Sequence, residues 1–200
     1  DEENNYLNPI CNYLGREKIK YLCEKHNVFV TTICADFLKK GTILLDTNKA
    51  KELRDYFDKL LLWSQELNIK YFIIPFLENT SLKDDEIAHK VKNFLINAVK
   101  DTEINILIET DLNAKKLLDY IENMNLQNVG ILYDVGNSCR YNYDFFSDFT
   151  ILKDKIKEIH LKDFCFKQKR SVRLGEGNVL FEEVFKNIFD CSWYGPLILE

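Results

Sequence analysis

The sequence lacks the long apolar runs, the excess of positive charge and the paired cysteines that mark several common classes of protein. No run approaches the roughly 18 apolar residues that a membrane-spanning helix requires, so we expect no membrane partner. The first residues, DEENNYLNPI, are polar and acidic and do not resemble a signal peptide. The 27 lysine and arginine residues are outnumbered by 32 acidic residues, and the net charge of −5 argues against nucleic acid as a partner.

The six cysteines form neither a CxxC pair nor a zinc-finger spacing. A chain of 200 residues, 46% of them hydrophobic, can bury a sizeable core without disulfide bonds. We therefore expect reduced thiols and a cytoplasmic location.

Short apolar runs alternate with longer amphipathic segments along the chain. Six runs have the composition of buried parallel strands: residues 28–34, 70–76, 104–110, 129–135, 156–163 and 196–200. Apolar residues recur at helical spacing in residues 10–26, 47–67, 82–99, 113–123, 141–154 and 179–189. This order predicts an α/β fold, either a doubly wound parallel sheet or a (β/α)8 TIM barrel.

A missing glycine motif favours the barrel. A doubly wound nucleotide-binding sheet carries G-x-G-x-x-G after an early strand, whereas the stretch TTICADFLKKGT has no such pattern. A closed TIM barrel needs eight strands, and only six are evident. We therefore expect a single, incomplete barrel domain over residues 1–200, with the first two strands missing.

Polar side chains recur at the ends of the last four predicted strands. They are Glu109, Asp134, His160 and Glu200. Asp134 follows Glu109 by 25 residues and His160 follows Asp134 by 26, which matches the roughly 20–30 residues of one strand–helix unit. The wider gap before Glu200 contains residues 164–178, which we expect to form a functional loop. Because the carboxyl ends of barrel strands meet at one mouth, these four side chains are predicted to converge.

The four side chains form a ligand set for one divalent metal ion. Two glutamates, an aspartate and a histidine suit Mn²⁺, Mg²⁺ or Co²⁺, with Zn²⁺ as an alternative. Each residue alone has a simpler explanation, since a strand-end aspartate often caps a helix and a histidine in a strand is often a hydrogen-bonded core residue. Together they favour a cation, because burying four such groups without one is costly.

The motifs around these residues resemble those of the xylose isomerase-like TIM barrels. The motifs ILIE, GILYDVGN, EIHLKD, LGEGNVLFEEVF and YGPLILE occur in the order seen in that superfamily. The similarity covers about residues 28–200 and is closest to sugar-phosphate isomerases and epimerases, including proteins like L-ribulose- and L-xylulose-5-phosphate 3-epimerase. The resemblance implies that Glu109, Asp134, His160 and Glu200 are metal ligands, and that Glu109 and Glu200 are also the catalytic acid–base pair.

The resemblance also points to residues that contact substrate. Many 3-epimerases have a histidine three residues after the metal-binding aspartate, where this chain has Asn137, so its contact with substrate differs there. An arginine upstream of the Gly-Glu-Gly motif often holds substrate in such enzymes. Arg170 is the better match to it and Arg173 the second choice, because the loop length differs.

Two further pairs have both a functional and a structural interpretation. Lys162 and Asp163 follow His160, and they either orient it or contact substrate, or else form a surface ion pair at the start of a loop. Gly175 and Gly177 either present backbone N–H groups to a phosphate or hydroxyl, or form a plain turn before the next helix.

The activity that the resemblance implies is that of a metal-dependent sugar or sugar-phosphate isomerase or epimerase. In such an enzyme the metal would supply Lewis acidity to a ketose carbonyl, one glutamate would remove the proton from the neighbouring carbon, and the other glutamate would return a proton to it. Return to the opposite face at C3 gives epimerisation, and transfer between C1 and C2 gives isomerisation. The partner is then a small sugar or sugar phosphate, and the oligomeric state stays open, a homo-oligomer included.

Three other functions are compatible with a barrel of this kind. An endonuclease IV-like repair enzyme needs several histidines for its zinc ions, and this chain has only three, one of them at a strand end. A non-catalytic sugar-binding barrel has no need of the Glu109/Glu200 pair. An inosose dehydratase-like lyase uses the same metal and enolate chemistry, and the sequence does not separate it from an epimerase.

Overall fold

The computed structural model describes residues 8–100 and 102–200. The chain divides into two compact units by its internal contacts. The first comprises the residues up to Thr110 together with Leu126–Val129, and the second comprises Asp111–Asn125 and Gly130–Glu200.

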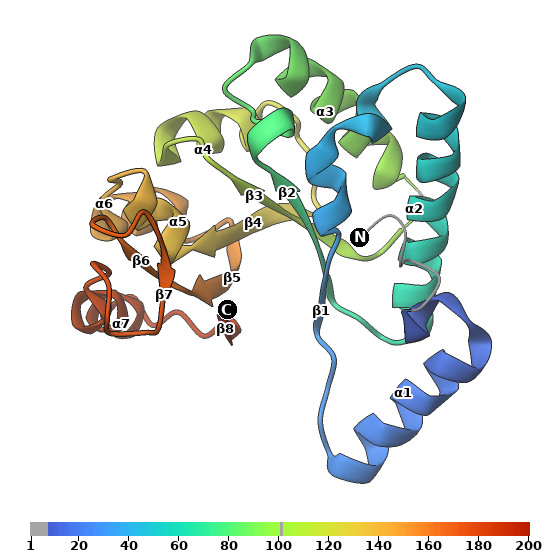
Figure 1. The fold of residues 1–200 in the computed structure, drawn as a ribbon, viewed down its shortest axis with the longest axis horizontal. Helices are drawn as coiled ribbons and strands as arrows, with labels where there is room; N and C mark the ends of the chain where they lie inside the picture. Colours follow the sequence, from blue (N-terminus) through green and yellow to red (C-terminus); the bar gives the residue numbers. More distant parts are fainter. Residues whose placement is uncertain (1–7, 101) are drawn as a thin grey trace. The chain divides into compact units, whose positions relative to one another are not determined.

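In the described part of the first unit, three parallel strands lie side by side (Figure 1). They are β1 (Thr32–Cys34), β2 (Tyr71–Phe76) and β3 (Asn105–Thr110). Tyr71 of β2 pairs with Thr32 of β1 on one side and with Asn105 of β3 on the other. Every residue of β2 is buried, as expected for a central parallel strand that is covered on both faces.

The helices of the first unit begin at polar caps and pack through aromatic residues. The α-helices are α1 (Tyr13–His26), α2 (Asn48–Glu66) and α3 (Asp85–Ala98), and 3₁₀ turns cover Pro9–Cys11, Asp36–Lys40, Thr42–Leu44 and Glu78–Thr80. The capping side chains that accept a backbone N–H are Asn12, Thr47 and Asp84. Phe57 of α2 packs against Phe72 of β2 and Phe94 of α3, with ring centroids 5.4 and 5.1 Å apart. These contacts attach both helices to the strands.

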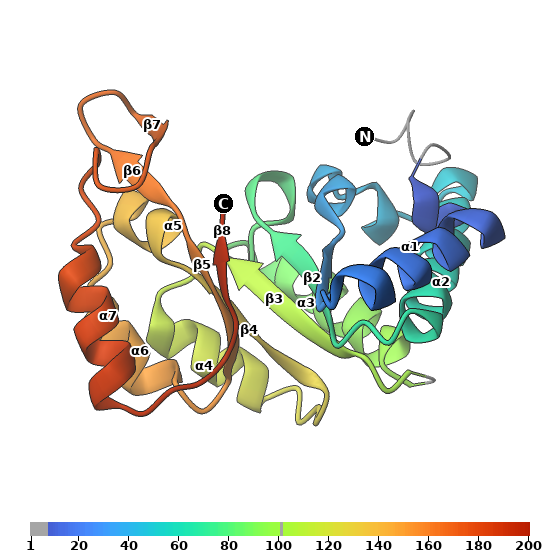
Figure 2. The ribbon, with the colours of Figure 1, turned by 90° about the horizontal axis from the view of Figure 1, so that it is seen from below.

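The second unit repeats the alternation of strand and helix. Its parallel strands are β4 (Val129–Asp134, whose first residue is counted in the first unit), β5 (Ile156–Leu161) and β8 (Leu197–Leu199). Its helices are α4 (Ala114–Glu122), α5 (Val135–Arg140), α6 (Phe145–Leu152) and α7 (Phe181–Asp190). Figure 2 shows α6 and α7 side by side along one side of the strands. Phe149 of α6 is buried there between Phe145 and Trp193.

All six predicted strands are confirmed, but their ends differ. Residues 28–31 are not part of β1, because its partner β2 begins only at Tyr71, opposite Thr32. Val28, Phe29 and Val30 are accordingly exposed. β5 ends at Leu161, two residues earlier than predicted.

Two elements of the second unit were not predicted. An antiparallel hairpin of β6 (Asp163–Cys165) and β7 (Arg170–Val172) forms within the segment that we expected to be a loop. Helix α5 begins directly after Asp134, ahead of the helix predicted over residues 141–154. Among the described residues, no helix has both the length and the apolar character needed to cross a bilayer.

Candidate metal centre

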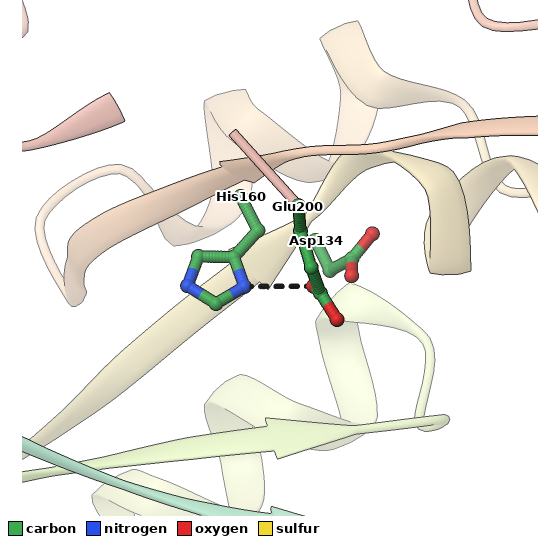
Figure 3. A group of neighbouring side chains, drawn as sticks. All are labelled: Asp134, His160 and Glu200. Carbon is green, nitrogen blue, oxygen red and sulfur yellow. Dashed lines mark hydrogen bonds and ion pairs between the residues drawn. The ribbon is translucent and has the colours of Figure 1, made fainter. Parts of the chain in front are cut away.

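Three of the four predicted ligands converge in the second unit. Asp134 ends β4, His160 lies in β5, and Glu200 directly follows β8. One ligand atom from each of these side chains lies within 4.8 Å of the others, and Figure 3 shows the three side chains gathered at the strand ends. Strand register produces this arrangement, because Asp134 pairs with His160 and Leu161 pairs with Leu199, the residue before Glu200.

Asp134 has two structural roles at once. It is the last residue of β4 and the N-cap of α5, and its Oδ1 accepts the backbone N–H of Asn137 at 2.8 Å. Its Oδ2 lies 3.4 Å from Nζ of Lys162. Burial raises the pKa of the Asp134 carboxyl, and the Lys162 ammonium opposes that shift. One oxygen therefore fixes the helix, and the other faces the cluster.

His160 is held between two carboxylates. Its Nδ1 lies 3.0 Å from Oε2 of Glu200, and its Nε2 lies 3.1 Å from Oε1 of Glu158. Burial by itself would lower the pKa of His160, but the hydrogen bonds to Glu158 and Glu200 outweigh it and raise the pKa to about 9. The two carboxylates therefore favour the protonated form of this imidazole.

Glu200 and Lys162 form the most accessible part of the cluster. The Glu200 side chain is 46% exposed, and its Oε1 lies 2.8 Å from Nζ of Lys162. The hydrogen bond from His160 lowers the pKa of Glu200 to about 2 against the opposing effect of burial, and Lys162 assists. Lys162, which the sequence offered as an orienting or substrate-contacting residue, is here the ion-pair partner of two candidate ligands.

The three donors fit a divalent cation. One imidazole nitrogen and two carboxylate oxygens are ligand types that Mn²⁺, Co²⁺ and Zn²⁺ accept, and the oxygens also suit Mg²⁺. Asp134 and His160 are only 5% and 9% exposed, whereas Glu200 opens toward solvent. Asp134 and His160 would hold an ion from the buried side of this site, and Glu200 would hold it from the side that opens to solvent.

Glu109, the fourth predicted ligand, belongs to the first unit. It lies near the end of β3, pairs with Pro75 of β2, and is 8% exposed. The Lys39 ammonium lies close enough to interact with it electrostatically. Its roles as a ligand and as one half of the acid–base pair stay predictions.

The predicted substrate-binding residues occupy different parts of the second unit. Asn137 lies in the first turn of α5, where its backbone N–H is bound to Asp134. Arg170 begins β7 and is exposed, and its Nε donates to Oε1 of Gln168 at 2.8 Å. Arg173 follows β7 and lines one surface pocket together with Arg170. Their contact with substrate stays a prediction.

Asp163 is a buried anchor, which the sequence did not indicate. It has no exposed surface, and its carboxylate accepts backbone N–H groups at 2.8–3.1 Å. The donors are Phe164, Gly175, Gly177 and Val179. Of the two interpretations of Gly175 and Gly177, the one in which they present their N–H groups to a phosphate or hydroxyl is wrong, since both groups bind Asp163. A Cβ on Gly177 would lie 2.2 Å from Oδ1 of Asp163, which explains the glycine.

Glu158 is the second functional residue that sequence reasoning missed. It is fully buried and lies two residues before His160 in β5. Side chains two apart on a strand share a face, so the pattern EIH carried the signal for this contact.

Parallel strands that alternate with helices, with polar side chains gathered at the carboxyl ends of the strands, define a (β/α) barrel. The described residues supply six of the eight strands of such a barrel, so the barrel is incomplete in this chain. The chain belongs to the xylose isomerase-like TIM barrel family, whose model matches residues 6–200.

Solved structures share this fold at low sequence identity. A D-tagatose 3-epimerase-like protein is 17% identical, with a TM-score of 0.76 over 94% of this chain and 77% of that one. The probable 3-DHS dehydratase AsbF of Bacillus anthracis is 14% identical, with a TM-score of 0.73 over 99% of this chain and 78% of that one. The IOLI protein, solved with a zinc atom, is 14% identical, with a TM-score of 0.65 over 92% of this chain and 83% of that one. A comparison with curated proteins finds no match.

Proposed function

We propose that this chain carries the active site of a metal-dependent sugar or sugar-phosphate isomerase or epimerase. The convergence of Asp134, His160 and Glu200 at neighbouring strand ends is the observation that carries this proposal. The family supports it, and so does the fold shared with an epimerase-like protein and with a barrel that holds zinc. A bound divalent ion at this position supplies Lewis acidity next to a substrate carbonyl.

Glu200 is suited to move a proton. Its lowered pKa keeps it ionised at neutral pH, and its half-exposed side chain is accessible to a substrate. Hydrogen bonds from His160 and Lys162 fix both of its oxygens, which limits the orientations that it adopts. We assign Glu200 to remove or return the proton on the carbon next to the carbonyl, and Glu109 to act as the second acid–base group.

The substrate contacts follow from the positions of the cationic side chains. Lys162 borders the metal ligands, and Arg170 and Arg173 lie on and beside the β6–β7 hairpin. These groups suit the hydroxyl and phosphate oxygens of a sugar or sugar phosphate. Asn137 replaces the histidine of many related 3-epimerases and is assigned to a neutral hydrogen bond with a hydroxyl group.

The test is hydrogen exchange at the substrate. The full-length protein is loaded with Mn²⁺ and incubated in D₂O with a panel of ketoses and ketose phosphates. A parallel sample loaded with Mg²⁺ is used to measure C–H exchange by NMR. Exchange at C3 supports an epimerase, and exchange at C1 supports an isomerase. Loss of water from the substrate would instead favour a dehydratase, the activity named for the structurally similar AsbF.

Matched variants make the test specific. His160→Ala should abolish exchange together with metal binding, whereas Glu200→Gln should lose exchange while Asp134 and His160 still retain metal. Asp148→Asn, which changes a buried carboxylate outside the cluster, is the control and should exchange normally. No exchange with any sugar, together with no metal binding by the wild-type protein, would refute the proposed function.

A further inference from the structure

Glu158 is a carboxylate enclosed in the second unit next to the candidate metal centre. Its side chain has no solvent exposure, and its Oε1 lies 3.1 Å from Nε2 of His160. The two residues are neighbours on the same face of β5 because strand side chains alternate. A buried carboxylate costs several kcal/mol unless it is paired and hydrogen-bonded. The contact with His160 therefore compensates part of a large penalty.

Glu158 is not itself one of the convergent ligands. Among the described residues, the group whose ligand atoms lie within 4.8 Å of one another contains Asp134, His160 and Glu200. His160 turns its Nδ1 toward this group, where Oε2 of Glu200 lies 3.0 Å away, and turns its Nε2 toward Glu158. Glu158 therefore touches the cluster through the imidazole ring of His160 and is not itself placed to ligate a cation.

We propose that Glu158 is a positioning residue that fixes the ring and tautomer of His160, so that Nδ1 is the nitrogen offered to the metal. This inference rests on the proposed metal site and assigns the buried partner of its histidine.

The chemistry of imidazole explains why such a partner is needed. A neutral ring carries one N–H and one lone pair, and only the nitrogen with the lone pair can bind a metal. A carboxylate at Nε2 accepts the N–H there, which leaves the lone pair on Nδ1, and it also increases the basicity of the ligating nitrogen. Without Glu158, the ring could carry its proton on Nδ1, the nitrogen that faces Glu200.

Two substitutions separate the acceptor from the charge. Glu158→Gln keeps an acceptor oxygen but removes the charge, and Glu158→Leu removes both. Loss of such a partner typically weakens metal binding about 10–100-fold. We expect Mn²⁺ titrated calorimetrically into the full chain to bind roughly 10-fold more weakly to Glu158→Gln, and more weakly still, toward 100-fold, to Glu158→Leu. Asp148 is another buried carboxylate of this unit. Asp148→Asn is therefore the matched control and should bind Mn²⁺ like the wild type.

The proton on His160 gives a readout that a merely structural role would not change. In wild-type protein labelled with ¹⁵N-histidine and loaded with Zn²⁺, NMR should place a directly bonded proton on Nε2 of His160 and none on Nδ1. A proton on Nδ1 in that sample would overturn the inference. Wild-type Mn²⁺ affinity in Glu158→Gln would overturn it as well, and this variant decides the question should Glu158→Leu fail to fold.

His160→Ala separates this inference from the proposed function. If His160→Ala abolishes Mn²⁺ binding while both Glu158 variants bind normally, the metal site stands and the positioning role fails. If the wild type and His160→Ala bind Mn²⁺ equally, or neither binds it, both proposals fail.

Discussion

The Lys162 ammonium lies 2.8 Å from Oε1 of Glu200 and also 3.4 Å from Oδ2 of Asp134. A single side-chain cation is thus shared between two of the three candidate metal ligands. Its own side chain is only 20% exposed, so water screens these contacts incompletely. The relationship implies that a bound metal ion and Lys162 compete for the same negative charge.

The first prediction concerns this competition. Lys162→Met keeps the length of the side chain and removes its charge, so the repulsion between the ammonium and a divalent ion disappears. We expect Mn²⁺ to bind roughly tenfold more tightly, equivalent to about 1.4 kcal/mol, as measured by calorimetric titration. The metal-free variant should also unfold at lower temperature, because two carboxylates lose their counter-charge.

Lys186→Met is the matched control for this experiment. Lys186 pairs with Asp190 on α7, and its side chain is 74% exposed. Its loss should change neither metal affinity nor stability appreciably, since exposed pairs contribute little. Unchanged or weaker Mn²⁺ binding by Lys162→Met would show that the lysine does not compete with the ion.

The second prediction concerns the pH dependence of stability. Burial raises the pKa of Asp148, although its carboxylate accepts a hydrogen bond from the Tyr133 hydroxyl at 2.8 Å. A carboxyl whose pKa is higher in the folded than in the unfolded state stabilises the fold below its unfolded pKa, about 3.9. That contribution is lost as the pH rises through the folded pKa.

Asp148→Asn imitates the protonated carboxyl and keeps an oxygen that can accept from Tyr133. Its urea unfolding midpoint should therefore exceed that of the wild type at pH 7, and the two midpoints should approach each other as the pH falls toward 4. A variant that is less stable than the wild type at pH 7 would mean that the ionised form is the favoured one.

The third prediction concerns the anchor at Asp163. A methyl group on Gly177 would lie 2.2 Å from Oδ1 of Asp163 and 2.7 Å from the carbonyl oxygen of Phe164. Gly177→Ala should therefore displace the buried carboxylate and cost about 1–3 kcal/mol in urea unfolding. Gly175→Ala is the comparison, because its Cβ meets no atom within 4 Å and the cost comes only from its φ of +85°.

We expect Gly175→Ala to lose about 1–2 kcal/mol through backbone strain alone. Gly177→Ala and Asp163→Asn should be strongly non-additive, because both act on the same hydrogen bonds. Additive losses of stability would mean that Gly177 and Asp163 act independently.

The six strands were predictable because each is a short apolar run, and β2, β3, β4 and β5 are largely buried, whereas β1 and β8 are partly exposed. The ligand positions followed from the same pattern, since Asp134, His160 and Glu200 each stand where an apolar run ends. Strand register then places these three residues side by side. Once the strands are predicted, the convergence of their carboxyl ends is therefore largely predicted as well.

The hairpin and the two buried carboxylates could not be predicted in the same way. Strands β6 and β7 are short and contain charged residues, so no alternation of apolar and polar residues marks them in the sequence. Three of the four partners of Asp163 lie 12 to 16 residues away along the chain, and such contacts are visible only in three dimensions. Glu158 is a charged residue in a strand, which looks like an exposed position until the packing around β5 is known.

The four backbone hydrogen bonds to Asp163 bear on how the β6–β7 hairpin moves. They bind Phe164, in the first strand of the hairpin, and residues 175–179, which follow its second strand, to the one carboxylate of Asp163. Movement of the whole hairpin about its base would require the hydrogen bonds to Asp163 to break. The base of the hairpin is therefore held in place, and any bending would be confined to the turn at residues 166–169, next to Arg170.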